Sequence, residues 1–139
     1  MPHLNRAVAT LRVVGLDLDP EQVSVLLGSS PSHSASKGQT VISPHGLAPR
    51  VARNGVWQLE AAATEPEDFD LQVAQLLGDL TKDIEVWRGL ANRYKLDIFC
   101  GWFMKESNEG VDIKSSTLEE LGRRGIALAL DIYAPDRDA

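Results

Sequence analysis

Three charged side chains fall inside segments that are otherwise typical of β-strands: Arg12, Asp97 and Asp131. In each segment the charge alternates with apolar residues, so it faces away from the apolar side of its strand. The three groups meet if the first strand lies between the third and the fourth. An arginine flanked by two carboxylates is then a structural ion cluster. The same cluster is also suited to acid–base catalysis, with Asp97 or Asp131 as a general base and Arg12 as an anion clamp.

Polar and aromatic side chains share this face of the predicted sheet. Gln58 in the second strand, Phe99 in the third and Tyr133 in the fourth follow the same alternation as the charged residues. Together with the charges they predict a concave surface for a ligand or a partner, and the alternative is a face whose polar groups serve structure alone.

Another group of candidates lies in the segment from Ser29 to Asn54, which is rich in serine, proline and glycine. Connections of this length are usually binding loops or mobile segments. Lys37, Arg50 and Arg53 are anion-binding candidates there. The alternative is a solvated loop that contains one short strand at Thr40-Val41-Ile42.

The conventional catalytic and metal-binding motifs are missing from the sequence. It has neither the glycine spacing of a nucleotide-binding loop nor the Gly-x-Ser-x-Gly pattern of a hydrolase. His3, His33 and His45 are far apart in predicted loops, which disfavours a zinc site. Cys100 alternates with apolar residues, which predicts a buried, inert thiol. No metal site and no cofactor are therefore expected, and no catalytic residue is assigned.

Four predicted strands and three predicted helices position these residues. The first helix begins after Asp19, where Pro20 suits the first turn, and Gly28 can end it in a left-handed conformation. Alternation and turn residues predict strands over residues 7–14, 55–61, 94–103 and 126–133.

The other two predicted helices begin at capping boxes. Thr64-Glu65-Pro66-Glu67 opens the longest helix, which the apolar spacing extends to about residue 92. Its polar side is expected to carry Asp70 and Gln72. The second capping box, Ser116-Thr117-Leu118-Glu119, predicts a short helix before the last strand.

This order of elements predicts an α+β fold. Two strand–helix–strand units that look weakly alike, joined by the long helix, pack as a ferredoxin-like four-stranded sheet with its helices on one face. The alternative is a mixed, mostly parallel α/β sheet in which the long helix is itself a crossover. Trp57, Trp87 and Trp102 fall on the apolar side of their elements and are expected in the core.

Composition narrows the class of protein. With 139 residues, of which 43% are hydrophobic and 24% charged, residues 1–139 are expected to form a single globular domain. No apolar run is long enough for a membrane span, and no apolar leader follows Met1, which predicts a cytoplasmic protein. The net charge of −6 disfavours a nucleic-acid partner.

The run Asp97-Ile98-Phe99-Cys100-Gly101-Trp102-Phe103 resembles the "D-hydrophobic-F-C-G" strand of an uncharacterised bacterial family, domain of unknown function 4279. Other stretches resemble the family in the same order along nearly the whole chain. The resemblance implies no activity, substrate or catalytic residue. The matching stretches are Gly15-Leu16-Asp17-Leu18-Asp19-Pro20, Leu26-Leu27-Gly28, Lys37-Gly38, Gly55-Val56-Trp57-Gln58-Leu59, Leu118-Glu119-Glu120-Leu121 and Leu130-Asp131-Ile132-Tyr133.

These observations favour a binding or protein-interaction domain that uses the open sheet face or an edge strand. Its partner would be another protein or a second copy of the chain, with neither nucleic acid nor membrane involved. By analogy with other small acidic bacterial proteins, a toxin-neutralising immunity protein is one version, and the negative charge favours a basic partner. The competing hypothesis is a small enzyme in which Asp97 or Asp131 is the base and Arg12 binds an anion.

Overall fold

A five-stranded mixed sheet forms one layer of the protein, and a computed structural model describes it over residues 7–42, 48–62, 64 and 68–135. The strand order is β2-β5-β1-β6-β7, in which the β6–β7 pair is parallel and the other three pairs are antiparallel. The strands are β1 (Ala7–Gly15), β2 (His33–Ala35), β5 (Gly55–Glu60), β6 (Lys95–Phe103) and β7 (Ala127–Tyr133).

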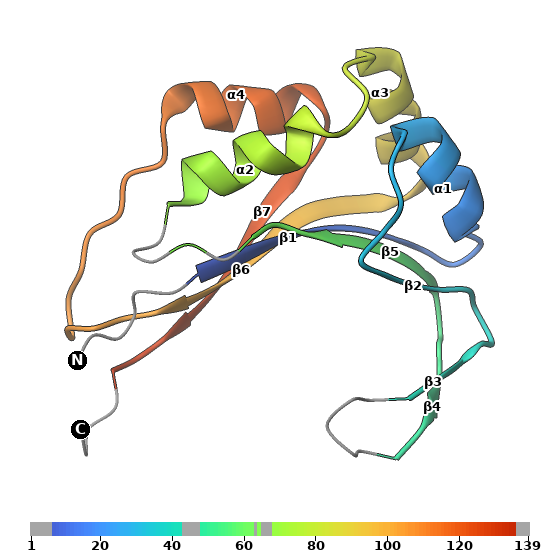
Figure 1. The fold of residues 1–139 in the computed structure, drawn as a ribbon, viewed down its shortest axis with the longest axis horizontal. Helices are drawn as coiled ribbons and strands as arrows, with labels where there is room; N and C mark the ends of the chain where they lie inside the picture. The colour runs from blue at the N-terminus through green and yellow to red at the C-terminus, as the bar shows by residue number, and fades with distance from the viewer. Residues whose placement is uncertain (1–6, 43–47, 63, 65–67, 136–139) are drawn as a thin grey trace.

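Among the described residues, four helices lie on one face of this sheet, and no helix lies over the other face (Figure 1). We call the uncovered side the open face. The helices are α1 (Pro20–Leu27), α2 (Phe69–Gly78), α3 (Ile84–Arg93) and α4 (Ser115–Arg123).

The core fills the space between the sheet and the helices. Alternate residues of β1, Ala9, Leu11 and Val13, are fully buried on the helix side, as the alternation predicts. Trp57 and Trp87 are also fully buried, and Trp102 is 9% exposed, so the prediction for the three tryptophans is confirmed.

The start and end of α1 agree with the prediction. The Asp19 carboxylate accepts a hydrogen bond from the backbone N–H of Glu21, and Pro20 occupies the first turn. Gly28 ends the helix with φ +80°, a left-handed conformation that side chains with a Cβ rarely adopt.

The α+β class is confirmed, but the predicted strand order is wrong. β1 lies between β5 and β6, the second and third predicted strands, instead of between the third and the fourth. The two strand–helix–strand units that were expected to be alike also differ. The chain passes from β1 through α1 to β5, which is antiparallel to β1, whereas α4 connects β6 to its parallel neighbour β7. The mostly parallel alternative fails as well, because only one of the four pairs is parallel.

The predicted long helix is two helices, α2 and α3, separated by residues 79–83. The backbone N–H of Thr81 makes no helical hydrogen bond and instead donates to the carbonyl of Leu27 at the end of α1. Asp83 then caps α3 by accepting from the N–H of Glu85. Local capping and a tertiary hydrogen bond therefore outweigh the helical periodicity at this point.

Neither predicted capping box acts as expected in the described residues. Residues 65–67 of the first lie outside them, and Asp68 caps α2 by accepting from Leu71. The α4 cap position is Lys114, whose side chain makes no capping bond. Instead, the carboxylate of Asp70 in α2 accepts from the N–H of Lys114, 3.1 Å, and from the hydroxyl of Thr117, 2.6 Å. One helix thus supplies the cap of another.

Gln72 also differs from its expected exposure on the polar side of the long helix. Its side chain is fully buried, and its Oε1 accepts a hydrogen bond of 2.5 Å from the backbone N–H of Ala9. Its Nε2 donates to the hydroxyl of Thr64. The carboxamide therefore ties α2 to the central strand β1.

The segment from 29 to 54 forms β2 and then a two-stranded ladder of β3 (Thr40–Val41) and β4 (Arg50–Val51). The predicted short strand at 40–42 is thus confirmed over two residues. We call residues 36–42 and 48–54 the arm. Figure 1 shows that the arm extends from the β2 and β5 side of the sheet away from the helices.

The packing of Trp57 gives a prediction for the core. Its ring is fully buried between β5 and the helices, and its Nε1 donates to the hydroxyl of Ser24 in α1. We expect Trp57→Ala to lower the free energy of unfolding by about 3–5 kcal/mol in urea denaturation. Val25→Ala at an exposed position of α1 is the control and should change it by about 0.5 kcal/mol or less. Equal effects of the two variants would contradict the assigned packing.

Candidate functional site

An ion pair joins the two central strands on the open face. Arg12 of β1 and Asp97 of β6 are direct partners in the strand register. Arg12 Nε donates to Asp97 Oδ1 and its Nη2 donates to Oδ2, both at 2.7 Å. This two-point geometry is the strong form of an arginine–carboxylate pair. It confirms one of the two contacts predicted for Arg12.

The pair is buried to different degrees at its two ends. The side chain of Asp97 is 6% exposed, whereas that of Arg12 is 32% exposed and lies over Phe99, 4.6 Å from the guanidinium carbon to the ring centre. The hydrogen bonds from Arg12 to Asp97, with the attraction between their charges, raise the pKa of the guanidinium further above its ordinary value. Arg12 is therefore a permanent charge that is locked in place.

Asp131 does not belong to this cluster, so the predicted triad is wrong. In the register of β6 and β7 it lies beside Gly101, four residues along β6 from Asp97. The triad required β1 to lie next to β7, whereas β6 separates the two strands. Asp131 is exposed and accepts a hydrogen bond of 2.7 Å from the hydroxyl of Tyr133.

Tyr133 belongs to an aromatic pair at the outer end of the sheet. Its ring stacks on that of Phe103, with the centroids 4.5 Å apart and the planes 10° from parallel. The two rings lie over Gly101, where a Cβ would reach van der Waals contact with both. The hydrogen bond to Asp131 raises the pKa of the Tyr133 hydroxyl. We call the exposed apolar side chains here the edge patch: Phe103, Leu130, Ile132 and Tyr133.

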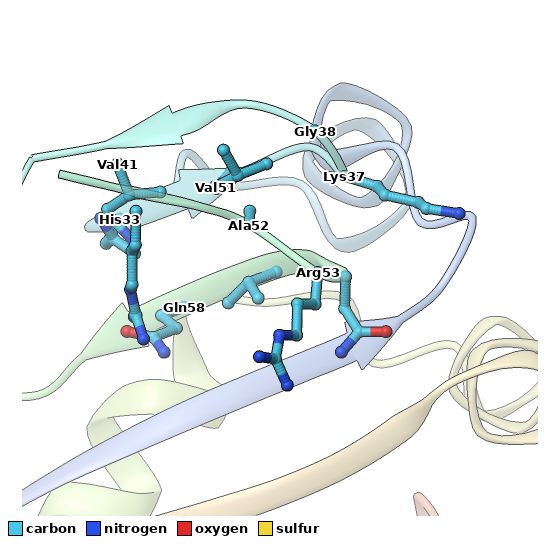
Figure 2. A pocket seen from close by; sticks show the side chains of 12 residues that line it. His33, Lys37, Gly38, Val41, Val51, Ala52, Arg53 and Gln58 are labelled. Carbon is cyan, nitrogen blue, oxygen red and sulfur yellow. The ribbon is translucent and has the colours of Figure 1, made fainter.

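A cavity of about 950 Å³ lies between the arm and the sheet, and we call it the arm pocket. Figure 2 shows Arg53 pointing from the arm back toward the sheet, with His33 and Gln58 close to each other. Lys37 points away and lies at the rim. The pocket is lined by His33, Ala35, Lys37, Gly38, Val41, Arg50, Val51, Ala52, Arg53, Asn54, Val56 and Gln58.

The arm pocket joins two sets of candidates that are separate in the sequence. Gln58 was predicted on the open face, and Lys37, Arg50 and Arg53 in the loop, yet all four line this cavity. His33 was missed because it was predicted as a loop residue, whereas it lies in β2 opposite Gln58. The three-residue length of β2 leaves too few alternations to identify a strand.

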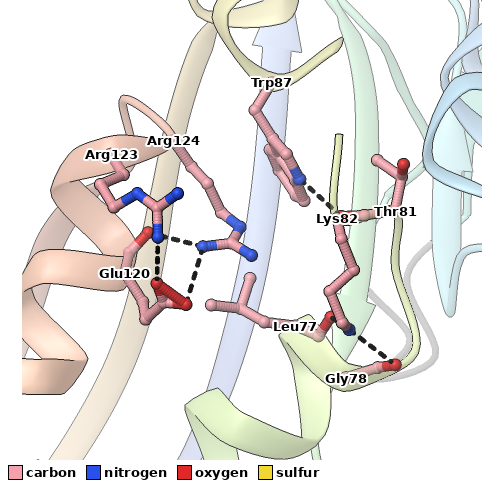
Figure 3. A network of polar contacts seen from close by, with 8 residues as sticks. All are labelled: Leu77, Gly78, Thr81, Lys82, Trp87, Glu120, Arg123 and Arg124. Carbon is pink, nitrogen blue, oxygen red and sulfur yellow. Dashed lines mark hydrogen bonds and ion pairs between the residues drawn. The ribbon is translucent and has the colours of Figure 1, made fainter. Parts of the chain in front are cut away.

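A second polar cluster, on the helix side, was not predicted. Arg124, at the end of α4, is 4% exposed and lies 5.8 Å from the ring centre of Trp87. Its Nη1 donates to the carbonyl and carboxylate of Glu120 (Figure 3), while its buried Nε has no hydrogen-bond partner in the portion of the chain that the structure describes. The i, i+4 spacing of Glu120 and Arg124 is the signal that could have indicated the pair.

A smaller cavity of about 290 Å³ lies beside Arg124, between α2 and α4. Its charged lining residues are two acids, Asp70 and Glu120, and two bases, Lys82 and Arg124. Lys82 donates to the last carbonyls of α2, and Asp70 caps α4. These groups serve the packing of the helices, which favours a structural role.

The carboxylates proposed as general bases are poorly arranged for that task. Both oxygens of Asp97 accept hydrogen bonds from Arg12 and the side chain is buried, so the carboxylate is engaged in the ion pair and has little contact with solvent or a substrate. Asp131 is exposed at the sheet edge, away from the arm pocket lining. Cys100 is 1% exposed, which confirms its predicted burial.

The described residues contain neither a cluster of side chains suited to a metal ion nor a helix suited to crossing a membrane. Among them, no group of three histidine, cysteine or acidic side chains is placed to hold a metal ion. In the same part of the chain, no helix combines the length and the apolar character that crossing a bilayer requires.

A comparison with known protein families yields a match. The model of a protein family described as "Domain of unknown function (DUF4279)" matches residues 5–135, which confirms the resemblance found in the sequence. No curated protein and no solved structure matches the chain. The strand that carries the family resemblance, 97–103, is β6, which holds Asp97 and Phe99.

The ion pair gives a prediction for a double-mutant cycle. Arg12→Met leaves the buried Asp97 carboxylate unpaired, so we expect Asp97→Asn to relieve part of its cost, with a coupling energy of about 1–2 kcal/mol in urea denaturation. Asp131→Asn is the control and should couple to Arg12→Met by less than about 0.5 kcal/mol. A larger coupling with Asp131 than with Asp97 would refute the observed register.

The Tyr133–Asp131 hydrogen bond gives a prediction for a pH titration. Phenolate absorbance, measured in a Tyr94→Phe background, should report Tyr133 ionising above the ordinary tyrosine value of about 10. The pKa of Tyr133 is raised because ionisation of its hydroxyl removes the donated hydrogen and places two negative charges together. Asp131→Asn should move the midpoint down. An unchanged midpoint in that variant would show that the bond does not persist in solution.

Proposed function

We propose that this chain, which belongs to the DUF4279 family, is a non-catalytic domain that binds a protein partner along the β7 edge of its sheet. The observation that carries the proposal is the exposure of β7. It is one of the two edge strands of the sheet and is seven residues long, and each of its residues is exposed or partly exposed. A strand of this kind presents free backbone N–H and C=O groups to another chain.

The edge patch gives this strand an apolar contact area on both faces of the sheet. Ile132 is 57% and Leu130 38% exposed on the helix side, while Phe103 is 48% and Tyr133 43% exposed on the open face. Apolar side chains gathered beside an unpaired strand support the addition of a partner strand. Backbone bonds would supply its affinity and these side chains its specificity.

The opposite edge of the sheet is less suited to this role. β2 has only three residues. The N–H of Ser32, the residue before it, donates to the carbonyl of Gln58 in β5. The hydroxyl of Ser32 also accepts from the N–H of Glu60. A short edge that continues into the arm offers little backbone to a second chain.

The charge around the edge patch favours a basic partner over a second copy. Asp131 lies in β7, and the segment 104–114 that leaves β6 holds three acids, Glu106, Glu109 and Asp112, against two lysines. The chain as a whole carries −6. Two copies would repel each other, whereas a basic protein with an extended segment would be attracted. Neutralisation of a basic toxin is one form that such binding could take.

Capture from an extract of the source organism tests the proposal when the edge is changed alone. Ile132→Lys adds charge to the patch and should abolish capture of a basic protein that the unaltered chain retains. Leu71→Lys, at an exposed site of α2, is the matched control and should retain it. In the purified complex, hydrogen exchange should slow in residues 127–133.

Two results would contradict the proposal. In the first, Ile132→Lys captures the same protein as the unaltered chain while its thermal unfolding is normal. In the second, analytical ultracentrifugation shows a dimer of this chain that Ile132→Lys dissociates, which would make a second copy the occupant of the edge.

A further inference from the structure

We infer that the arm pocket binds a small organic oxyanion, a compound that joins a phosphate or carboxylate group to a compact apolar part. This inference does not depend on the partner proposed for β7, because the arm pocket lies at the opposite edge of the sheet, beside β2 and β5. Three cations line the cavity, with Lys37 at its rim beside Arg50 and Arg53, and none of its described lining residues is acidic. A concentration of positive charge in a chain of net charge −6 is the first observation that supports it.

The state of the arginines is the second observation. Of the seven in the described residues, five make an ion pair or a hydrogen bond: Arg12, Arg88, Arg93, Arg123 and Arg124. Arg50 and Arg53 have neither within the same residues, and both line the arm pocket. Guanidinium groups with free donors are suited to oxyanions, which they can bind through two parallel hydrogen bonds.

The arm holds these groups on a hydrogen-bonded frame. The N–H of Gly38 donates to the carbonyl of Ala52, and the N–H of Ala52 donates to the carbonyl of Gln39, both at 2.9 Å. Gly38 has φ +88°, which lets the chain turn beside Lys37. Where the arm ends, a Cβ on Gly55 would collide with the backbone oxygen of Leu18, so the start of β5 packs closely against the turn between β1 and α1.

The rest of the lining indicates what else the ligand carries. Ala35 and Val56 on the sheet side and Val41 and Val51 on the arm form apolar walls. His33 and Gln58 in the sheet and Asn54 in the arm add polar groups to the lining. A few convergent polar groups against apolar walls are typical of small-molecule sites.

Size and charge favour a small ligand over a macromolecule. The volume of about 950 Å³ lies within the range of such sites, roughly 300–1,000 Å³. The chain's net charge of −6 opposes the approach of a nucleic acid or another extended polyanion. A small anion that reaches the pocket interacts mainly with the nearby cations, because salt screens charges beyond about 8 Å.

Isothermal titration calorimetry at constant ionic strength tests the inference with three probes: ATP, pyrophosphate and citrate. We expect saturable binding of at least one probe, with Kd on the order of 10⁻⁴ M. The two phosphate probes and the tricarboxylate distinguish the oxyanion, and ATP against pyrophosphate shows whether the apolar walls contribute. The double variant Arg50→Gln/Arg53→Gln should weaken binding about tenfold or more while leaving thermal unfolding unchanged.

The matched control is Arg88→Gln/Arg123→Gln, which removes the same charge from exposed arginines of the helix layer. It should leave Kd within about twofold, since these groups lie outside the pocket. The inference is overturned if no probe saturates at about 10 mM, or if the two double variants weaken binding equally. Tighter binding of a 20-nucleotide single strand than of ATP would also overturn it, because the site would then be a nucleic-acid surface.

Discussion

The ion pair between Arg12 and Asp97 is the contact around which the open face of the sheet is organised. It joins β1 to β6, the strands that bring the two halves of the chain together. Asp97 is buried, and it depends on Arg12 for the two hydrogen bonds that compensate its burial. Arg12 in turn covers Phe99. The two charges at the centre of the open face therefore neutralise each other, which leaves the margins of this face to interact with other molecules.

The two margins differ in chemistry, and this difference underlies the two proposed roles. On the β2 and β5 side, the arm adds a cavity and two arginines that have no ion pair or hydrogen bond within the described part of the chain. On the β7 side, the edge patch offers apolar side chains and free backbone groups with acidic residues nearby. One margin therefore suits a small anion and the other a basic strand. The helix layer covers the opposite face. Its buried contacts include the hydrogen bond from Ala9 in β1 to Gln72 and the packing of Arg124 against Trp87.

Local features of the fold could be predicted from the sequence because they depend on neighbouring residues. Asp19, Pro20 and Gly28 define α1, and alternation assigns Ala9, Leu11 and Val13 to the core. Strand order could not be predicted in the same way. Alternation states which face a side chain takes, but not which strand lies beside it. Arg12 was therefore placed on the correct face with one correct partner and one wrong partner.

The remaining differences arise where contacts distant in sequence override local patterns. Thr81 bonds to the end of α1 and helps divide a segment whose periodicity is helical throughout. Asp70 and Gln72 were expected in solvent, yet one caps α4 and the other bonds to β1. The candidate site shows the same limit. The loop cations were identified by type, whereas their meeting with Gln58 and His33 depends on how the arm folds back over β5.

Nitrogen-15 NMR of the Arg12 guanidinium tests the central ion pair most directly. In a two-point pair at 2.7 Å, the Nε–H of Arg12 should exchange slowly with water, and its two Nη groups should give separate signals. Asp97→Asn should collapse both features, whereas Asp131→Asn should preserve them. A freely rotating guanidinium with averaged Nη signals in the unaltered protein would contradict the pair and the organisation of the open face built on it.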